Sequence, residues 1–166
     1  NITVKYNLLK DISETAYLGM VVDSPGEVQE NLKVFGNIFY DSRSLPGTAC
    51  SFTISFAVKN TTLSGFEFYN NVVANMSGSS NAGVYSRAKS GGKNRAYNNI
   101  FYNNITRSLQ LQYTTNDYNF YSRNKTSDGR SRDIMDESNG QVESANPFKN
   151  MSKLNFELVS PTDQGK

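Results

Sequence analysis

The stretch Ala96-Tyr97-Asn98-Asn99-Ile100-Phe101 joins an apolar-alternating run, an asparagine and two large apolar residues, and this combination occurs five times in the chain. The other copies are Val4-Lys5-Tyr6-Asn7-Leu8-Leu9, Val34-Phe35-Gly36-Asn37-Ile38-Phe39, Phe68-Tyr69-Asn70-Asn71-Val72-Val73 and the shorter Asp117-Tyr118-Asn119-Phe120-Tyr121. The repeated asparagines, spaced by 30, 34, 28 and 20 residues, are Asn7, Asn37, Asn71, Asn99 and Asn119. A period of roughly 20 to 50 residues is typical of solenoids, propellers and repeat arrays.

Each copy after the first follows a second short run with the composition of a strand. These runs are 17–22, 52–58, 83–86 and 109–113. They suit strands and are too short for typical helices. The Ser-, Gly-, Pro- and Asn-rich stretches between runs vary in length, as the loops of a solenoid do. The sequence therefore predicts an all-β fold in which a strand–turn–strand–loop unit winds in one direction, which is a parallel β-helix.

The repeated asparagines have a structural explanation in such a fold. Stacked strands lie about 4.8 Å apart, and an amide side chain offers both a donor and an acceptor. Identical asparagines in successive coils can therefore bond to one another in a ladder. Asparagine also tolerates the left-handed backbone conformation of a sharp corner. We expect the five repeated asparagines to form this structural ladder at a corner of each coil.

The composition excludes several classes of protein. Hydrophobic residues make up 37%, aromatic residues 12% and charged residues only 19% of the 166 residues, which favours strands and one ordered domain. A net charge of +2 is too weak for a nucleic-acid interface, and no apolar run is long enough for a membrane span. The single cysteine, Cys50, cannot form an internal disulfide, and the absence of histidine excludes His-based catalysis and His-based zinc sites.

The sequence also carries a family resemblance in its repeats and in its ending. The motifs are Val34-Phe35-Gly36-Asn37-Ile38-Phe39, Tyr97-Asn98-Asn99-Ile100-Phe101-Tyr102-Asn103-Asn104, Ala145-Asn146-Pro147-Phe148, Leu154-Asn155-Phe156-Glu157-Leu158 and Ser160-Pro161-Thr162-Asp163-Gln164-Gly165. The repeats resemble the coils, and the ending resembles the "DP-x-F … DF-x-L … SPAIDxG" terminus, of secreted right-handed parallel β-helix proteins of the pectate-lyase-like superfamily. The resemblance covers essentially the whole chain. It implies the C-terminal portion of a right-handed, single-stranded solenoid of about five coils with an irregular C-terminal cap.

Members of this superfamily include polysaccharide lyases, glycoside hydrolases and non-catalytic surface proteins. Glycoside hydrolysis normally requires two carboxylates beside the scissile bond, but Glu67 is the only acidic residue between Ser51 and Asn116. A lyase needs a base to remove a proton and cations to neutralise a uronate carboxylate, which calcium supplies in several families. The resemblance allows such a calcium ion on coils preceding the sequence, whereas this segment offers no metal site.

A basic segment, 85–95, is the candidate for lyase chemistry. It contains four cations, and alternation along a strand would place Tyr85, Arg87 and Lys89 on one face. We expect Lys89 or Arg87 to act as the catalytic base. The candidate substrate-binding residues are Tyr85, Lys93, Arg95, Gln112 and Tyr113, with Gln110 beside them. An ordinary solvated basic loop and an exposed strand face remain the alternatives.

The two ends of the chain differ from the middle. We assign residues 1–123 to the β-helix coils and residues 124–166 to a polar loop and capping segment of the same domain. The apolar side of this cap over the last coil is expected from Phe148, Leu154, Phe156 and Leu158. At the other end the chain begins directly as a strand, so we expect upstream coils or a partner chain to stack on the first coil.

The resulting functional hypothesis is a secreted or cell-surface protein, extracellular or periplasmic, that is directed at carbohydrate. The leading interpretation is the C-terminal part of a polysaccharide lyase or related polysaccharide-degrading enzyme, with the active site on this segment or outside it. The alternative is a non-catalytic β-helix module for surface carbohydrate binding, adhesion or structural support. The expected partner is a polysaccharide, with acidic ones among the candidates, and neither nucleic acid nor a membrane span is expected.

Overall fold

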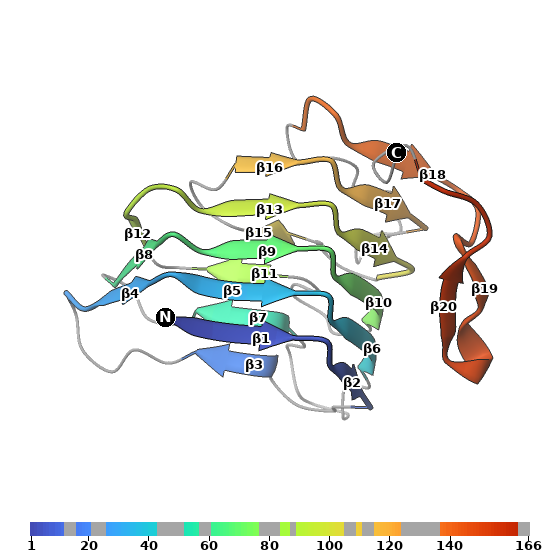
Figure 1. The fold of residues 1–166 in the computed structure, drawn as a ribbon, viewed down its shortest axis with the longest axis horizontal. Helices are drawn as coiled ribbons and strands as arrows, with labels where there is room; N and C mark the ends of the chain where they lie inside the picture. Colours follow the sequence, from blue (N-terminus) through green and yellow to red (C-terminus); the bar gives the residue numbers. More distant parts are fainter. Residues whose placement is uncertain are drawn as a thin grey trace.

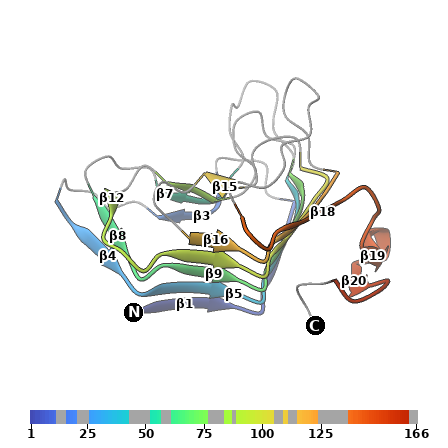
Figure 2. The same cartoon turned by 90° about the horizontal axis from the view of Figure 1, so that it is seen from above.

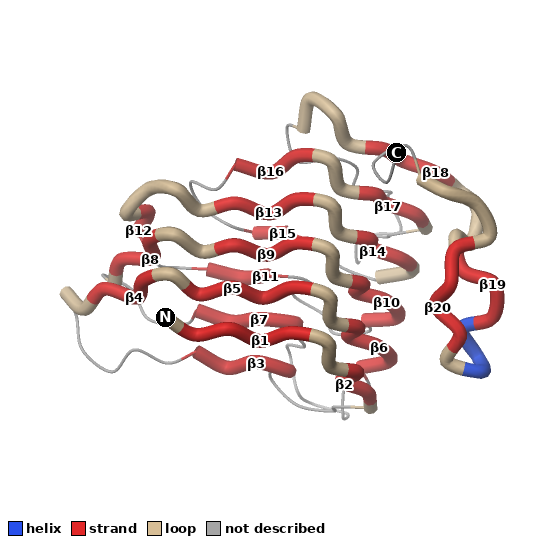
Figure 3. The backbone as a smooth tube through the Cα atoms, viewed as in Figure 1, coloured by secondary structure: helices blue, strands red, loops and turns tan. Residues whose placement is uncertain are grey.

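The computed structural model describes residues 1–11, 16–20, 26–42, 52–56, 61–76, 84–86, 89–104, 109–110, 115–123 and 137–162. The described chain is all-β, with twenty strands and one short 3-10 turn (Figure 3). For 16–20, 42, 52–56, 84–86, 89–90 and 109–110, only the backbone is described. All but two of the strands belong to four parallel sheets, which confirms the prediction of an all-β, parallel architecture.

The five-stranded sheet has the order β1-β5-β9-β13-β16. Its strands are β1 (Ile2–Lys5), β5 (Leu32–Phe35), β9 (Glu67–Tyr69), β13 (Arg95–Tyr97) and β16 (Thr115–Asp117). The six-stranded sheet has the order β18-β17-β14-β10-β6-β2. Its strands are β2 (Leu8–Lys10), β6 (Ile38–Ser42), β10 (Val72–Met76), β14 (Ile100–Tyr102), β17 (Phe120–Ser122) and β18 (Gln141–Glu143).

The two remaining parallel sheets are smaller. The four-stranded sheet contains β3 (Ala16–Met20), β7 (Phe52–Phe56), β11 (Val84–Ser86) and β15 (Leu109–Gln110). The three-stranded sheet contains β4 (Val28–Glu30), β8 (Thr62–Ser64) and β12 (Lys89–Ser90). The chain visits the five-, six-, four- and three-stranded sheets in this order three times, so counterpart strands of successive repeats lie side by side (Figures 1 and 2).

Side-chain alternation along these strands builds the core. In the five-stranded sheet the inward-facing register positions form the column Val4, Val34, Phe68, Ala96 and Asn116, of which the first and last are half-buried. In the six-stranded sheet the corresponding column is Leu9, Phe39, Val73, Phe101 and Tyr121. Most of these apolar side chains belong to one hydrophobic cluster, in which Val34, Phe39, Phe68, Val73 and Phe101 have no exposed surface. Burial of one face of each sheet fixes the register, because a slip of one residue would expose the whole apolar column.

A sharp corner joins the five-stranded to the six-stranded sheet in every repeat. The residue at this corner has a positive φ of 54–65° in each case, and it directly precedes the ladder asparagine. The corner residues are Tyr6, Gly36, Asn70, Asn98 and Tyr118. The expectation that the ladder asparagines themselves adopt the left-handed conformation is therefore wrong by one residue. The side chains of the ladder asparagines form the ladder, and the residue before each of them adopts the left-handed backbone conformation.

The repeated asparagines form a continuous hydrogen-bonded ladder at this corner. Both the backbone N–H and the side-chain Nδ2 of Asn37 donate to Oδ1 of Asn71, at 3.0 and 3.1 Å. The same pair of bonds joins Asn7 to Asn37, Asn71 to Asn99 and Asn99 to Asn119. Nδ2 also donates to a backbone carbonyl of a neighbouring strand, as from Asn71 to Val34. Asn37, Asn71, Asn99 and Asn119 are at most 1% exposed, so these bonds satisfy amides that would otherwise be buried without partners.

A carboxylate ends the ladder. Glu137 accepts from the backbone N–H of Asn119 at 3.0 Å and from its Nδ2 at 2.9 Å, in the place that a sixth asparagine would occupy. The hydroxyl of Tyr121 donates to the same carboxylate at 2.5 Å. Burial raises the pKa of the Tyr121 hydroxyl far above its ordinary value, and the charge of Glu137 adds to this effect. Tyr121 therefore stays protonated and remains a donor.

The C-terminal segment does two things that differ from the expected cap over the last coil. β18 pairs in parallel with β17, so the six-stranded sheet continues beyond residue 123. The antiparallel hairpin of β19 (Phe148–Asn150) and β20 (Asn155–Leu158), joined by a 3-10 turn (Met151–Lys153), then lies beside the six-stranded sheet (Figures 1 and 2).

The hairpin covers the second, outer face of that sheet. Phe148 meets Tyr102 edge-on at 5.9 Å, and Phe156 meets Tyr40 edge-on at 5.3 Å. Phe148, Phe156 and Leu158 thus provide apolar contacts, but sideways rather than over the end of the stack. Leu154 makes no such contribution, because it is 43% exposed and takes the left-handed position that ends the 3-10 turn.

Candidate functional site

The structure separates the residues of the predicted basic site. Tyr85 lies in β11 of the four-stranded sheet, Lys89 in β12 of the three-stranded sheet and Arg95 in β13 of the five-stranded sheet. The single strand face expected for Tyr85, Arg87 and Lys89 is therefore not formed, because the chain passes from one sheet to another between Tyr85 and Lys89. Arg87 itself lies outside the described residues, and its role as a base stays a prediction, as does that of Lys89.

The predicted binding residues are partly brought together. Tyr85 and Gln110 occupy facing register positions on β11 and β15, so these two positions are adjacent in the four-stranded sheet. Gln112 and Tyr113 lie outside the described residues. Lys93 is exposed and has a φ of 59° in the turn that precedes β13. Lys93 and Arg95 are two residues apart, but Lys93 lies in the turn before β13 and Arg95 lies in β13 itself. The sequence alone does not show where this turn ends and the strand begins.

Arg95 is engaged in an ion pair rather than available as an isolated cation. Its Nη2 atom lies 2.6 Å from Oε1 of Glu67, which is its register partner on β9. Lys33 approaches the same carboxylate at 3.4 Å from the other side. Burial alone would raise the pKa of the Glu67 carboxyl, but the hydrogen bond from Arg95 and the two positive charges outweigh burial and lower this pKa. The group is thus an ionised carboxylate between two cations.

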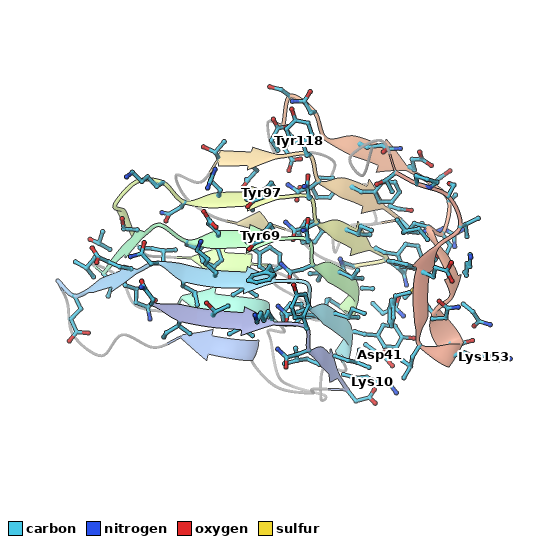
Figure 4. All side chains as sticks on the ribbon, viewed as in Figure 1. Lys10, Asp41, Tyr69, Tyr97, Tyr118 and Lys153 are labelled. Carbon is cyan, nitrogen blue, oxygen red and sulfur yellow. The ribbon has the colours of Figure 1, made fainter. Side chains whose placement is uncertain are left out.

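These residues belong to one of two columns on the outer face of the five-stranded sheet. The charged column is Thr3, Lys33, Glu67, Arg95 and Thr115. The aromatic column, two residues further along each strand, is Lys5, Phe35, Tyr69, Tyr97 and Asp117. Figure 4 shows Tyr69 and Tyr97 on neighbouring strands of this face. Each member of the aromatic column comes two residues before a ladder asparagine, so the repeat itself could have revealed the column.

Three rings of the aromatic column are stacked face to face. The ring centres of Phe35 and Tyr69 are 4.8 Å apart with an interplanar angle of 9°, and those of Tyr69 and Tyr97 are 5.0 Å apart with an angle of 2°. These separations match the spacing of strands in a sheet. The rings therefore face one another in the direction in which the strands stack, and their edges point towards solvent.

A hollow of about 540 Å³ lies where the stack ends. Its lining residues come from the last two strands of the five-stranded sheet and the corners after them: Arg95, Tyr97, Asn98, Thr115, Asp117 and Tyr118. The side chain of Tyr118 is 47% exposed at the edge of this region (Figure 4). The volume lies in the range of sites that bind small molecules or single sugar rings.

Asp117 is the acidic group of this hollow. Its Oδ1 accepts from the backbone N–H groups of Tyr118 and Asn139 at 2.9 and 2.8 Å, and its Oδ2 accepts from Nδ2 of Asn139 at 2.9 Å. Desolvation would raise the pKa of the Asp117 carboxyl, but the bonds from Asn139 and Tyr118 outweigh it and lower this pKa. The C-terminal segment therefore holds an ionised carboxylate in a fixed orientation at the rim of the hollow.

The arrangement does not form a paired-carboxylate centre from Glu67 and Asp117. β13 lies between their strands, and the two residues are also offset by two positions along the strand. Strand geometry then puts their Cα atoms roughly 12 Å apart. Each carboxylate is bound to its own partners, Glu67 to Arg95 and Lys33, and Asp117 to Asn139 and Tyr118. Among the described residues, no cluster of three or more His, Cys, Asp or Glu side chains is arranged to hold a metal ion. Within the same residues, no helix is long and apolar enough to cross a membrane.

Comparison of the sequence with protein-family models, with curated proteins and with solved structures finds no match. Function is therefore inferred from the geometry of the site. The roles of Asp117 and Asn139 at the hollow and of Glu137 at the end of the ladder were not predicted from the sequence. Asn139 and Glu137 follow the last repeat in the sequence, and their partners are not related to them by the repeat.

Proposed function

We propose that this chain is a secreted or cell-surface, carbohydrate-directed protein with a right-handed parallel β-helix fold, and that it binds a polysaccharide on the outer face of its five-stranded sheet. The fold is supported by the repeated visiting order of the sheets and by parallel pairing between successive repeats. Parallel connections within a sheet are almost always right-handed, which supports the handedness. The asparagine ladder is consistent with a chain that winds in one direction through its repeats.

The hollow at the end of the aromatic stack is the observation that carries the functional proposal. Sugar rings have an apolar C–H face that packs on aromatic rings and a rim of hydroxyl groups that need hydrogen-bonding partners. The hollow offers both, with the ring of Tyr97 beside the hydroxyl of Thr115, the amide of Asn98 and the carboxylate of Asp117. Arg95, on the outer face of the same sheet, also lines the hollow, so a longer sugar chain could continue from the hollow along this face.

Binding is tested by affinity electrophoresis of the whole chain in gels that contain neutral or acidic polysaccharides. We expect at least one polysaccharide to retard the protein, and Tyr97→Leu to reduce the retardation while the variant keeps its circular dichroism spectrum. Migration unaffected by every neutral and acidic polysaccharide would refute the proposed function.

A polysaccharide lyase is the second candidate, with Lys89 or Arg87 as the base. The observation that favours this candidate is that Tyr85 and Gln110 occupy facing register positions of the backbone, close in sequence to Lys89. The test is the ultraviolet absorbance of unsaturated product ends after incubation with acidic polysaccharides. Product formation that disappears in Lys89→Ala or Arg87→Ala would support the lyase, whereas product formation unchanged in both variants would exclude these bases.

A further inference from the structure

The aromatic stack has two unlike ends. At the β1 end, Tyr6 meets Phe35 edge-on, with ring centres 5.5 Å apart and an interplanar angle of 86°. The Lys5 ammonium lies 6.0 Å from the centre of the same Phe35 ring. Side chains of the protein therefore close this end. Tyr69 is covered on both faces, because Phe35 and Tyr97 stack on its two sides.

At the β16 end, the stack stops at Tyr97. One face of Tyr97 packs on Tyr69, and the register partner on the other side is Asp117, which has no ring. The guanidinium carbon of Arg95 is 5.6 Å from the centre of the Tyr97 ring, but the bond to Glu67 holds this group on the β9 side. The hollow of about 540 Å³ lies at this end and includes both Tyr97 and Asp117 in its lining.

The chemistry of the lining restricts what can occupy the hollow. Arg95 forms its ion pair with Glu67 on the β9 side, and among the described lining residues Asp117 is the only acidic one, so it supplies the negative charge that faces a ligand on the β16 side. Asn139 and Tyr118 fix the Asp117 carboxylate with three hydrogen bonds, so its orientation is set before a ligand arrives. A carboxylate attracts hydroxyl or ammonium donors and repels a second carboxylate.

We propose that this hollow is a subsite for one non-acidic sugar ring, which continues the stack by lying on the open face of Tyr97 and donates hydroxyl hydrogen bonds to Asp117. The ring takes the place that a fourth aromatic residue of the stack would have at the Asp117 position. This inference rests on the proposed polysaccharide binding and adds the class of sugar, which excludes a uronate at this position. The subsite lies on a different sheet from Lys89, where an acidic polysaccharide was expected, although Arg95 of the same basic segment lines the hollow.

The test uses isothermal titration calorimetry of the full chain with matched hexasaccharides. The probes are hexamers of glucan, mannan and galactan beside their C6-oxidised counterparts glucuronan, mannuronan and galacturonan. We expect at least one neutral hexamer to bind more tightly than its acidic counterpart. Tyr97→Leu should weaken this binding by about tenfold, because it removes the aromatic face but keeps an apolar side chain. Tyr6→Leu is the matched control at the closed end and should change the affinity by less than about twofold.

Asp117→Asn separates the role of the charge from that of the shape. Asparagine keeps an oxygen acceptor for the backbone N–H groups of Tyr118 and Asn139 and loses only the acceptor of the exposed Asn139 Nδ2 group, so the variant should keep its fold and bind the neutral hexamer. The preference for the neutral over the acidic hexamer should fall by about threefold to tenfold, because the repulsion of a uronate is gone.

Tighter binding of the acidic hexamers by the unmodified protein, or equal effects of Tyr97→Leu and Tyr6→Leu, would overturn the subsite while leaving polysaccharide binding in place. Failure of all six hexamers and of long polysaccharides to bind would overturn both proposals.

Discussion

The corner that carries the asparagine ladder and the outer face of the five-stranded sheet lie only two residues apart in each repeat, yet they follow opposite rules. The ladder position uses asparagine five times, and its side chains from the second repeat onward are buried and bonded to the next asparagine or, at Asn119, to Glu137. The outer face changes from Lys5 to Phe35, two tyrosines and Asp117 along one column. The buried ladder thus fixes the register of the strands, whereas the residues on the outer face differ from one repeat to the next. A position that varies along a column within a rigid repeat is where a specific function can be placed.

Substitution within the ladder gives the largest expected effect. Asn71→Ala removes the acceptor of the Asn37 N–H and Nδ2 groups and the donor to the Val34 carbonyl, all of which are buried. Because each buried polar group left without a partner costs about 1 to 3 kcal/mol, the free energy of unfolding should fall by about 3 to 5 kcal/mol. The measurement is urea denaturation followed by circular dichroism.

The matched control is the preceding residue. Asn70 is exposed and has a φ of 54°, so Asn70→Gly should change the free energy of unfolding by less than about 0.5 kcal/mol. Equal losses of stability in Asn71→Ala and Asn70→Gly would show that the ladder does not hold the repeats in register.

The end of the ladder should be nearly as sensitive. Glu137→Ala leaves the N–H and Nδ2 groups of Asn119 and the hydroxyl of Tyr121 without their acceptor. We expect a loss of about 2 to 4 kcal/mol in the free energy of unfolding, and a loss about half as large for Glu137→Gln, which keeps one acceptor oxygen. Urea denaturation of both variants measures this difference. The assignment would be wrong if Gln and Ala at this position behaved alike and both matched the unmodified protein.

On the outer face, the corresponding ion pair should contribute little. The side chains of Lys33 and Arg95 are about half exposed, at 49% and 55%, so Glu67→Gln should cost less than about 1 kcal/mol at pH 7. The folded state lowers the pKa of the Glu67 carboxyl from 4.5. Its contribution to stability is therefore complete above the pKa of the unfolded chain and is lost as the pH falls through the lower pKa of the folded chain.

The pH dependence provides the check on this small effect. Denaturation of the unmodified protein and of Glu67→Gln should differ at pH 7 and converge at a pH below the folded-state pKa, where both side chains are neutral. Arg95→Gln should raise the Glu67 pKa, as seen in an NMR titration of the carboxyl carbon. A difference in stability that grows as the pH falls would contradict the stated direction of the shift.

The sequence predicted the parts of the structure that repeat. The spacing of the asparagines equals the register offsets of the parallel strands, as in Ile2 opposite Leu32 and Glu67 opposite Arg95, so the ladder and the all-β parallel pairing were both accessible. The left-handed corner was assigned one residue too late, because asparagine suits both the corner and the ladder and occupies both positions in Asn70-Asn71 and Asn98-Asn99.

The parts that do not repeat were harder to predict. Tyr85, Arg87 and Lys89 were expected on one strand face, but Tyr85 and Lys89 lie in different sheets. Phe148, Leu154, Phe156 and Leu158 were expected to cover the last coil, but the outer face of the six-stranded sheet is itself apolar, and Phe148 and Phe156 pack there. Which of two apolar surfaces a segment covers depends on chain path, and local sequence patterns do not contain that information.

The most direct test of the central claim is an NMR titration of the isotope-labelled chain with the neutral hexasaccharide that it binds. We expect the backbone amide signals of Tyr97, Thr115 and Tyr118 to shift as the ligand concentration increases. The side-chain amide signals of the buried ladder, such as those of Asn37 and Asn71, should stay in place. Shifts confined to Tyr85 and Gln110 in the four-stranded sheet, with the Tyr97 region unchanged, would contradict the central claim.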